Sequence, residues 1–346
     1  MALEEPDRVP VFCQLSLGHY MLNAGREPYR VWFSPEDFAA SLGDLARRYD
    51  FDGVLVNLPG RPPGWEGLIA SMERLPGARR IDWQGGGSSL CPDADNVHYQ
   101  GGARRPGLDE IDPDILYFIE PHGITEVTYP FSFDFAPPNF AKGPSFFPPY
   151  FLDTLKLAVR DCGEELHVSS ELPSPFTQMM ELLGYSEGLL ALMDDPGKCE
   201  RILASLAEGT AELAILQSRA GADAILVSSA FASGGFLSLD HYRRFVLPFE
   251  KAVTERVHRE TRTPIYVHTC GAIGDRIGAM VEAGFDGIDT MDPPPLGNTD
   301  IAKVKEEFGE RIFLKGNLDP VNLLLNGSVE AIRGRALELV RVAGRG

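Results

Sequence analysis

The chain has 346 residues, 44% of them hydrophobic, which suits one large globular domain with a substantial core. Its 32 Lys and Arg residues stand against 50 Asp and Glu, for a formal net charge of −18. That balance argues against a nucleic-acid partner, because phosphates require a basic surface.

The composition also bears on membranes and on the compartment. No run approaches about 18 consecutive apolar residues, so we expect no membrane span and no membrane partner. The acidic start, MALEEPDR, lacks the basic and apolar regions of a signal peptide. The five cysteines suggest no paired disulfide framework. We therefore expect a cytoplasmic protein with reduced thiols.

In the first half of the chain, three apolar runs predict strands and one segment predicts a helix. The strands are expected at Val9–Leu17, Phe51–Pro59 and Leu166–Pro173. The segment Ser34–Tyr49 has Ser34 as a helix N-cap followed directly by a proline, which favours a helix start.

The stretch from about residue 83 to 149 differs from its surroundings. It is rich in Gly, Pro and aromatic residues, as in WQGGGSSL, YPFSFDFAPPNF and GPSFFPPYF. It is also too long for a simple connection. We interpret it as an insertion with a hairpin and loops that cover the mouth of the fold, where such segments often contact substrate.

The second half alternates strands and helices. Strands are expected at Ala222–Phe231, Thr263–Gly271, Phe285–Asp292 and Ile312–Pro320. Helices are expected at Asp240–Glu260, Ile273–Ala283, Asp300–Phe308 and Val329–Val342. Strands that are apolar almost throughout and separated by helices indicate a parallel sheet covered on both faces.

These elements predict a single α/β domain over residues 1–346, a TIM-type (β/α)8 barrel. A closed barrel needs eight strands and the sequence supplies seven, so we expect the eighth strand to be missing from this chain. The alternative is an open doubly wound sheet, for which neither a G-x-G-x-x-G nor a Walker loop gives support.

The most informative motif is Val267-His-Thr-Cys-Gly271. His268 and Cys270 are two residues apart on a predicted strand, so they share one face. Near the C-terminal end of a barrel strand, where active sites form, imidazole and thiolate are a zinc-type ligand pair. The alternative is that both are ordinary core residues near a strand end.

Three segments resemble the uroporphyrinogen decarboxylase superfamily: LSLDHYRRFVLPFEKAVTERVH, TPIYVHTCGAIGDRIGAMVEAGFDGIDTMD and FLKGNLDPVNLL. The resemblance runs from about Glu171 to the C-terminus, and more loosely from Val9 to Pro59. His-x-Cys on this strand marks the branch of zinc methyltransferases that act with corrinoid proteins. It implies a zinc held by His268 and Cys270, with a third ligand, a cysteine, expected beyond Gly346.

The decarboxylase branch of that superfamily is marked by other residues, which are missing here. The arginine loop RQAGRY is replaced by QLSLGHYMLNAGREPYR, and the acidic residue after the second strand is absent from VNLPGRP. A tyrosine after the third strand appears as Glu181, and a serine after the fourth falls near Ala232.

The resemblance therefore implies a zinc-dependent methyltransferase. It would move a methyl group between a small methylated molecule, for example a methoxylated compound, and a methyl-corrinoid on a partner protein. The alternatives are uroporphyrinogen decarboxylase itself, or a catalytically inactive barrel that serves as a binding subunit.

Other candidate residues lie at the predicted strand ends. Glu171 is a candidate acid or further metal ligand, against a structural hydrogen bond to a loop. Asn317 and Asp319, in GNLDP, are candidate substrate contacts, although an Asp before Pro is equally a turn or cap residue. Aromatic residues of the insertion are candidates for a substrate pocket or for packing within the insertion: Phe131, Phe133, Phe135, Phe146 and Phe147.

Overall fold

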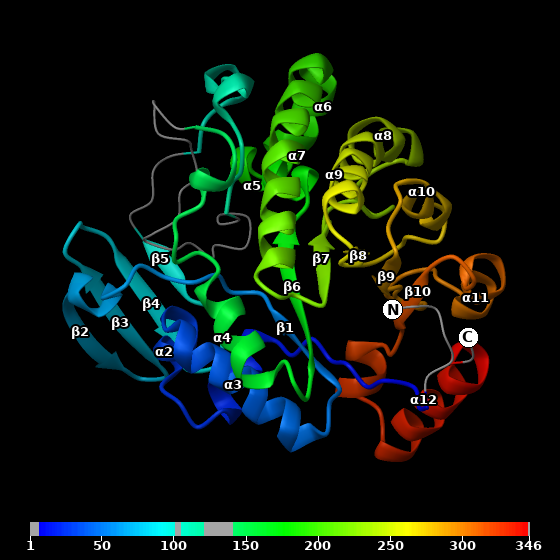
Figure 1. Ribbon diagram of the computed structural model, residues 1–346, viewed down its shortest axis with the longest axis horizontal. Helices are drawn as coiled ribbons and strands as arrows, with labels where there is room; N and C mark the ends of the chain where they lie inside the picture. Colours follow the sequence, from blue (N-terminus) through cyan, green and yellow to red (C-terminus); the bar gives the residue numbers. More distant parts are fainter. Residues whose placement is uncertain (1–6, 101–104, 121–140, 345–346) are drawn as a thin grey trace.

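A parallel sheet of six strands is the centre of the structure, a computed structural model that describes residues 7–100, 105–120 and 141–344. In spatial order the strands are β1 (Gly53–Val56), β6 (His167–Pro173), β7 (Ala224–Ser228), β8 (Ile265–His268), β9 (Gly287–Thr290) and β10 (Phe313–Gly316). Every neighbouring pair is parallel. The sheet curls into a half-barrel (Figure 1). In the described part of the chain, β1 and β10 are its two edges, so the predicted incomplete barrel is confirmed.

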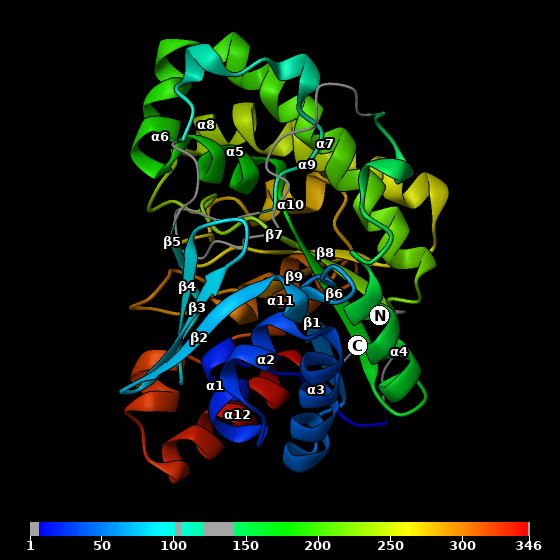
Figure 2. The same cartoon turned by 90° about the vertical axis from the view of Figure 1, so that its left-hand side faces the viewer.

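Helices surround this sheet (Figures 1 and 2). They are α1 (Leu17–Asn23), α2 (Pro28–Phe33), α3 (Pro35–Tyr49), α4 (Asp153–Cys162), α5 (Pro175–Leu183), α6 (Tyr185–Asp194), α7 (Pro196–Arg219), α8 (Leu239–Phe245), α9 (Leu247–Glu260), α10 (Ile277–Glu282), α11 (Ile301–Phe308) and α12 (Val329–Ala343). Of these, α3, α4, α5 and α7 contact strands β1, β6 and β7. None of the helices within the described residues is long and apolar enough to cross a membrane.

Two predicted helices show how local sequence sets helix ends. The helix expected at Ser34–Tyr49 is α3, and its cap is the Ser34 hydroxyl, which accepts a hydrogen bond from the Asp37 amide at 3.2 Å. The single helix expected at Asp240–Glu260 is two helices, α8 and α9, joined at Val246. Pro248 lacks an N–H group and sits in the first turn of α9, where this loss costs least.

Alternate residues along the strands separate two cores. Val54, Ile225 and Val267 point outward and pack against the helices. Leu55, Ala224, Leu226 and Tyr266 point inward and form a separate cluster in the concave lumen. This period of two also fixes which polar residues face the lumen at the strand ends.

The strand predicted at Val9–Leu17 is wrong. Residues 9–16 run in an extended path, and α1 begins at Leu17. Among the described residues, Val11 hydrogen-bonds only to Asp52: its carbonyl accepts from the Asp52 amide at 2.8 Å, and its amide donates to the Asp52 carboxylate at 2.6 Å. Pro10 has no N–H to extend a ladder.

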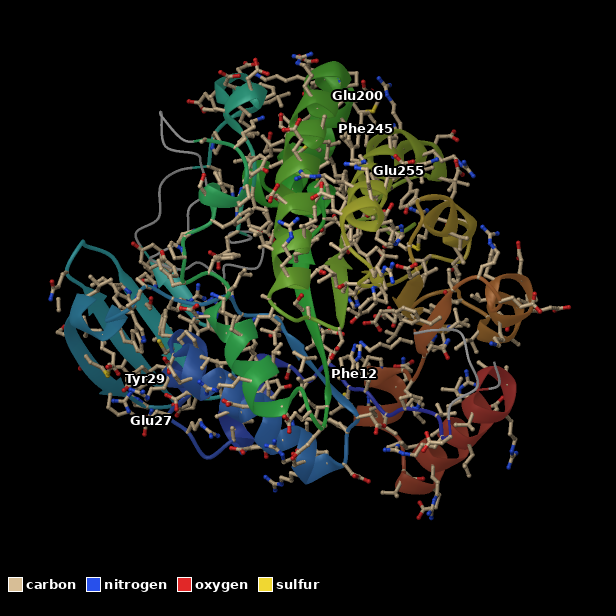
Figure 3. All side chains as sticks on the ribbon, viewed as in Figure 1. Phe12, Glu27, Tyr29, Glu200, Phe245 and Glu255 are labelled. Carbon is tan, nitrogen blue, oxygen red and sulfur yellow. The ribbon has the colours of Figure 1, made fainter. Side chains whose placement is uncertain are left out.

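One apolar residue of that segment packs into the lumen. The Phe12 ring, labelled in Figure 3, packs against the lumen cluster together with Phe313. Gly53 makes room for it, because a Cβ there would lie 2.6 Å from the ring.

The insertion begins earlier than predicted and is more regular. It forms an antiparallel sheet of β2 (Ile69–Leu75), β3 (Ala78–Trp83), β4 (Ser88–Pro92) and β5 (His98–Gln100), on the opposite side of the molecule from α11 and α12 (Figure 1). The first strand was missed because its partly buried residues, Ile69, Met72 and Leu75, are three apart and do not alternate. A register shift after Ile69 interrupts the pairing there.

Candidate active site

Five polar side chains lie in order at the C-terminal ends of five adjacent strands. They are Glu171 of β6, Ser228 of β7, His268 of β8, Asp289 of β9 and Lys315 of β10. Ser228 is paired in register with His268, His268 with Asp289, and Asp289 with Lys315. Since His268 is two residues beyond the lumen residue Tyr266, its side chain faces the lumen. We call these five residues the polar arc.

His268 and Cys270 lie side by side at the end of β8. The distance from His268 Nε2 to Cys270 Sγ is 3.2 Å. The His268 side chain is 17% exposed, and Cys270 is exposed. The turn that follows is fixed by Asp292, whose carboxylate accepts a hydrogen bond from the Gly271 amide at 2.7 Å. The two side chains therefore converge on one point that solvent reaches.

The other ring nitrogen of His268 is held from β9. Nδ1 lies 2.7 Å from the Thr290 hydroxyl and 3.8 Å from Oδ2 of Asp289. Thr290 and Met291 both have positive φ, 76° and 49°. A β-branched residue in this region is unusual, and such strain clusters at functional sites. In this conformation the Thr290 hydroxyl lies beside Nδ1 of the imidazole.

The buried charges around His268 are balanced. Burial acts to lower the pKa of His268, but its interactions with the neighbouring Asp289 and Cys270 outweigh this and raise the pKa to about 10. Burial acts to raise the pKa of Asp289, but His268 and Lys315 outweigh it and hold the pKa below the ordinary 3.8. Lys315 Nζ lies 2.7 Å from Asp289 Oδ2 and 4.3 Å from the centre of the Phe12 ring.

The end of β10 supports the backbone at Thr290 and Met291, where φ is positive. Asn317 is buried, and its amide donates a hydrogen bond to the Met291 carbonyl at 3.0 Å. At Gly316 (φ 135°) a Cβ would lie 2.4 Å from the Thr290 carbonyl oxygen. Asn317 therefore supports the backbone beside His268.

Asp319 is a cap. Its carboxylate accepts hydrogen bonds from the Val321 amide at 2.9 Å and the Asn322 amide at 2.7 Å, at the start of the π-helical turn Pro320–Leu325. The amides two and three residues after a cap are the ones that a helix cap binds. Asp319 therefore acts as a cap, which is one of the roles expected of an Asp before Pro.

Glu171, at one end of the polar arc, also lines a cavity of about 330 Å³. The Ser228 side chain hydrogen-bonds its carboxylate, and Gln14 Nε2 lies 3.5 Å from Oε2. Burial raises the pKa of Glu171, and the charge of His268 partly offsets this. The structure thus brings Glu171 close enough to His268 for their charges to interact.

Of the insertion aromatics, Phe131, Phe133 and Phe135 lie outside the described residues. Phe146 and Phe147 pack against each other and against Tyr117, with ring centres 5.1 to 6.4 Å apart. Neither lines the cavity.

The donor set fits part of a zinc site. Imidazole and thiolate are zinc ligands, and His268 and Cys270 already converge. A catalytic zinc takes about three protein ligands. In the ranges that the structure describes, no three His, Cys, Asp or Glu side chains gather to hold a metal ion.

Sequence reasoning missed Asp289, Thr290, Lys315 and Ser228. Each lies at the end of a predicted strand, and Asp289 and Lys315 are polar interruptions of apolar runs, in FDGIDT and IFLKG. A polar residue at the lumen position of a strand end was the signal that could have found them.

Comparison with protein-family models shows which family the chain belongs to. The model for uroporphyrinogen decarboxylase (URO-D) matches residues 136–346, more than half of the chain. The chain belongs to the uroporphyrinogen decarboxylase family. The match includes the whole polar arc and the segments that carried the resemblance.

Curated relatives in this family are distant. A uroporphyrinogen decarboxylase of Alkalilimnicola ehrlichii is 28% identical over 206 residues, covering 57% of this chain and 54% of the relative. One of Methylococcus capsulatus is 33% identical over 159 residues, covering 45% of this chain and 42% of the relative. The chain spans about half the length of the curated relatives it matches.

A solved structure resembles the fold of this family member over nearly its full length. A methyltransferase from Methanosarcina mazei has a TM-score of 0.67 at 18% identity, covering 98% of this chain and 87% of that one. At this identity the likeness shows the fold alone. It supports the half-barrel and its assignment to the TIM-barrel class.

Proposed function

We propose that this protein is a zinc-dependent methyltransferase that moves a methyl group between a small methylated molecule and a corrinoid held by a partner protein. The observation that carries the proposal is the 3.2 Å approach of His268 Nε2 to Cys270 Sγ at the open end of the half-barrel. The fold likeness to a methyltransferase and the His-x-Cys resemblance support it.

Different residues of the chain would bind the metal, orient the imidazole and bind the substrate. His268 and Cys270 would hold the metal, which when bound supplies a Lewis acid for the heteroatom that carries the methyl group. Thr290 and Asp289 fix the imidazole through Nδ1, so that Nε2 stays directed toward Cys270. The adjacent cavity binds the small substrate and shields it from water.

The transfer is a displacement at carbon. The methyl group leaves the oxygen, nitrogen or sulfur of the substrate, which keeps the electron pair of the broken bond and takes up a proton. A reduced corrinoid on the partner protein would supply the electron pair for the new bond. The exposed side of Cys270 leaves space for such a partner to approach.

The test measures zinc content and methyl transfer in the same set of variants. We expect purified protein to retain zinc after dialysis, and His268→Ala and Cys270→Ala to lose it. Cys199→Ala, which removes a buried thiol on α7, is the matched control. With free cob(I)alamin as acceptor and 2-methoxyphenol as donor, the wild type and control should form methylcobalamin. Retention of zinc by both site variants, or full methyl transfer without His268 and Cys270, would overturn the proposal.

The second candidate is uroporphyrinogen decarboxylation, which the names of the curated relatives favour. That reaction needs a pocket for a substrate with many carboxylates. Within the described residues, the cavity beside the polar arc has no Lys or Arg in its lining. Conversion of uroporphyrinogen to coproporphyrinogen by the purified protein would establish this candidate in place of methyl transfer.

A further inference from the structure

Residues 8–14 contact both edges of the half-barrel without joining its sheet. The Phe12 ring of this segment lies against Gly53 of β1, where a Cβ would approach it to 2.6 Å, and against Lys315 of β10, at the other edge. We call residues 8–14 the N-terminal strap.

The strap is anchored at Asp52, directly before β1. The Arg8 guanidinium donates hydrogen bonds to both carboxylate oxygens of Asp52. The Val11 amide donates to the same carboxylate at 2.6 Å, and the Val11 carbonyl accepts from the Asp52 amide at 2.8 Å. These bonds hold the backbone directly before Phe12, so the anchor sets the direction in which the ring enters the lumen.

Two residues of the strap contact the two ends of the polar arc. Phe12 and Gln14 are two apart in an extended segment, so their side chains leave on the same side. The centre of the Phe12 ring lies 4.3 Å from Nζ of Lys315, at one end of the arc. Gln14 Nε2 lies 3.5 Å from Oε2 of Glu171, at the other end. The strap therefore joins the ends of the arc on the side where the sheet is open.

The Lys315 ammonium is held by rings as well as by a carboxylate. Its Nζ lies 4.3 Å from the centre of the Phe12 ring and 5.8 Å from that of Tyr266, both within the range of a cation–π interaction. The Lys315 side chain is only 16% exposed, and such interactions are stronger where water is excluded. A lysine has a long flexible stem, so these contacts restrict where its ammonium meets Asp289.

We infer that Phe12 is a positioning residue for His268. Its ring holds the Lys315 ammonium against Asp289, at 2.7 Å from Oδ2, and that carboxylate in turn holds the imidazole from the Nδ1 side. The N-terminal strap is thus part of the site, although none of its residues is a proposed zinc ligand. The inference rests on the proposed function, because it takes zinc to bind at His268 and Cys270.

The first test compares three lumen variants for zinc affinity, measured by competition with a chromogenic chelator. Phe12→Leu keeps an apolar side chain but removes the ring face, and it should weaken zinc binding about threefold to fivefold. Phe12→Tyr keeps the ring and should stay within twofold of the wild type. The control is Phe313→Leu, which removes a ring of the same cluster that packs on Tyr266, and it should also stay within twofold. Equal losses in Phe12→Leu and Phe313→Leu would reduce Phe12 to general lumen packing and overturn the inference.

The second test asks whether Phe12 acts through Lys315. If it does, Phe12 has no effect on zinc once the ammonium is gone, so the double variant Phe12→Leu/Lys315→Met should bind zinc within twofold of Lys315→Met alone. A double variant that binds zinc a further threefold to fivefold more weakly than Lys315→Met would show that the two residues act independently, which contradicts the inference.

The third test needs no metal. Zinc-free protein is treated with acetic anhydride, and acetylation of each lysine is followed by peptide mass spectrometry, with the exposed Lys303 as the internal reference. Lys315 should react at least threefold faster in Phe12→Leu than in the wild type, while Lys303 reacts at the same rate in both. Zinc binding by the wild type with unchanged Lys315 reactivity in Phe12→Leu would overturn the role of Phe12 and leave the proposed function standing. Faster Lys315 acetylation in Phe12→Leu, in a protein whose wild type binds no zinc, would sink the proposed function and leave the hold of Phe12 on Lys315 standing.

Discussion

Lys315 Nζ lies 2.7 Å from Oδ2 of Asp289, at the ends of neighbouring strands, where the Asp289 side chain is buried and the Lys315 side chain is 16% exposed. The same carboxylate oxygen lies 3.8 Å from Nδ1 of His268. A buried carboxylate is held in one orientation by its partner, so Lys315 fixes Asp289, and Asp289 and Thr290 together fix the imidazole.

Because Asp289 and Lys315 orient His268, we expect substitutions of either residue to weaken zinc binding although neither is a proposed zinc ligand. Asp289→Asn should weaken zinc binding by about 10- to 100-fold, since the residues that orient a ligating His usually contribute that much. Lys315→Met should weaken it about tenfold, because Asp289 would lose its fixed partner. Competition with a chromogenic chelator measures both.

The control for that experiment is Lys303→Met, which removes an exposed lysine on α11. It should bind zinc like the wild type. Unchanged zinc affinity in Asp289→Asn, with the fold intact by circular dichroism, would show that the carboxylate does not orient His268.

The close approach of β10 to the Thr290 carbonyl predicts a cost in stability. Gly316→Ala should lower the free energy of unfolding by about 2 kcal/mol or more, because its Cβ would lie 2.4 Å from that oxygen at φ 135°. Gly334→Ala, in α12 with open space around it, should raise stability by about 0.5–1 kcal/mol. Urea unfolding measures both, and a Gly316→Ala protein as stable as the wild type would contradict the geometry.

A buried acid away from the site predicts a pH dependence of stability. Glu250 of α9 accepts a hydrogen bond from Tyr242 at 3.2 Å, and burial raises its pKa from 4.5 to about 7. The folded state therefore holds this proton more tightly than the unfolded state. Its contribution to stability is present below about pH 4.5 and is lost as the pH rises through 7.

The corresponding variant should remove that dependence. Ionised Glu250 costs about 3 kcal/mol above pH 7, so Glu250→Gln should match the wild type at pH 5 and be more stable at pH 8. Glu255→Gln, exposed on the same helix and labelled in Figure 3, should leave the pH profile as it is. Parallel wild-type and Glu250→Gln curves between pH 5 and 8 would show that Glu250 is ionised throughout.

The cap assigned to Asp319 predicts a structural effect only. Asp319→Ala should lower the melting temperature by about 2 °C, the usual consequence of a lost helix cap in a chain of this size. It should leave the rate of methyl transfer at saturating substrate unchanged. Steady-state assays and thermal unfolding separate these outcomes. A large fall in turnover with unchanged stability would show that Asp319 takes part in the reaction.

Much of the sheet could be predicted from the sequence because its signals are local. Apolar strands separated by helices predicted the parallel sheet, and six of the seven predicted strands are present. The period of two placed His268 on the lumen face, but Cys270 lies beyond the end of β8, and its approach to His268 depends on the turn that Asp292 holds. The strand predicted at Val9–Leu17 failed because an apolar run does not by itself specify strand pairing: Phe12 packs, partly buried, against the lumen cluster, while Val9 and Val11 are exposed.

Only the tertiary structure decided which side chains surround His268. Thr290, Asp289 and Lys315 reach it because three strands far apart in the sequence pair in one register, and no local pattern records that register. The same holds for the cavity, whose lining includes both Trp32 of α2 and Glu171 of β6. The sequence by itself determined which residues face the lumen, since the alternation of a strand is a property of its own backbone. Their neighbours across the sheet depend on long-range packing, which the folded chain alone provides.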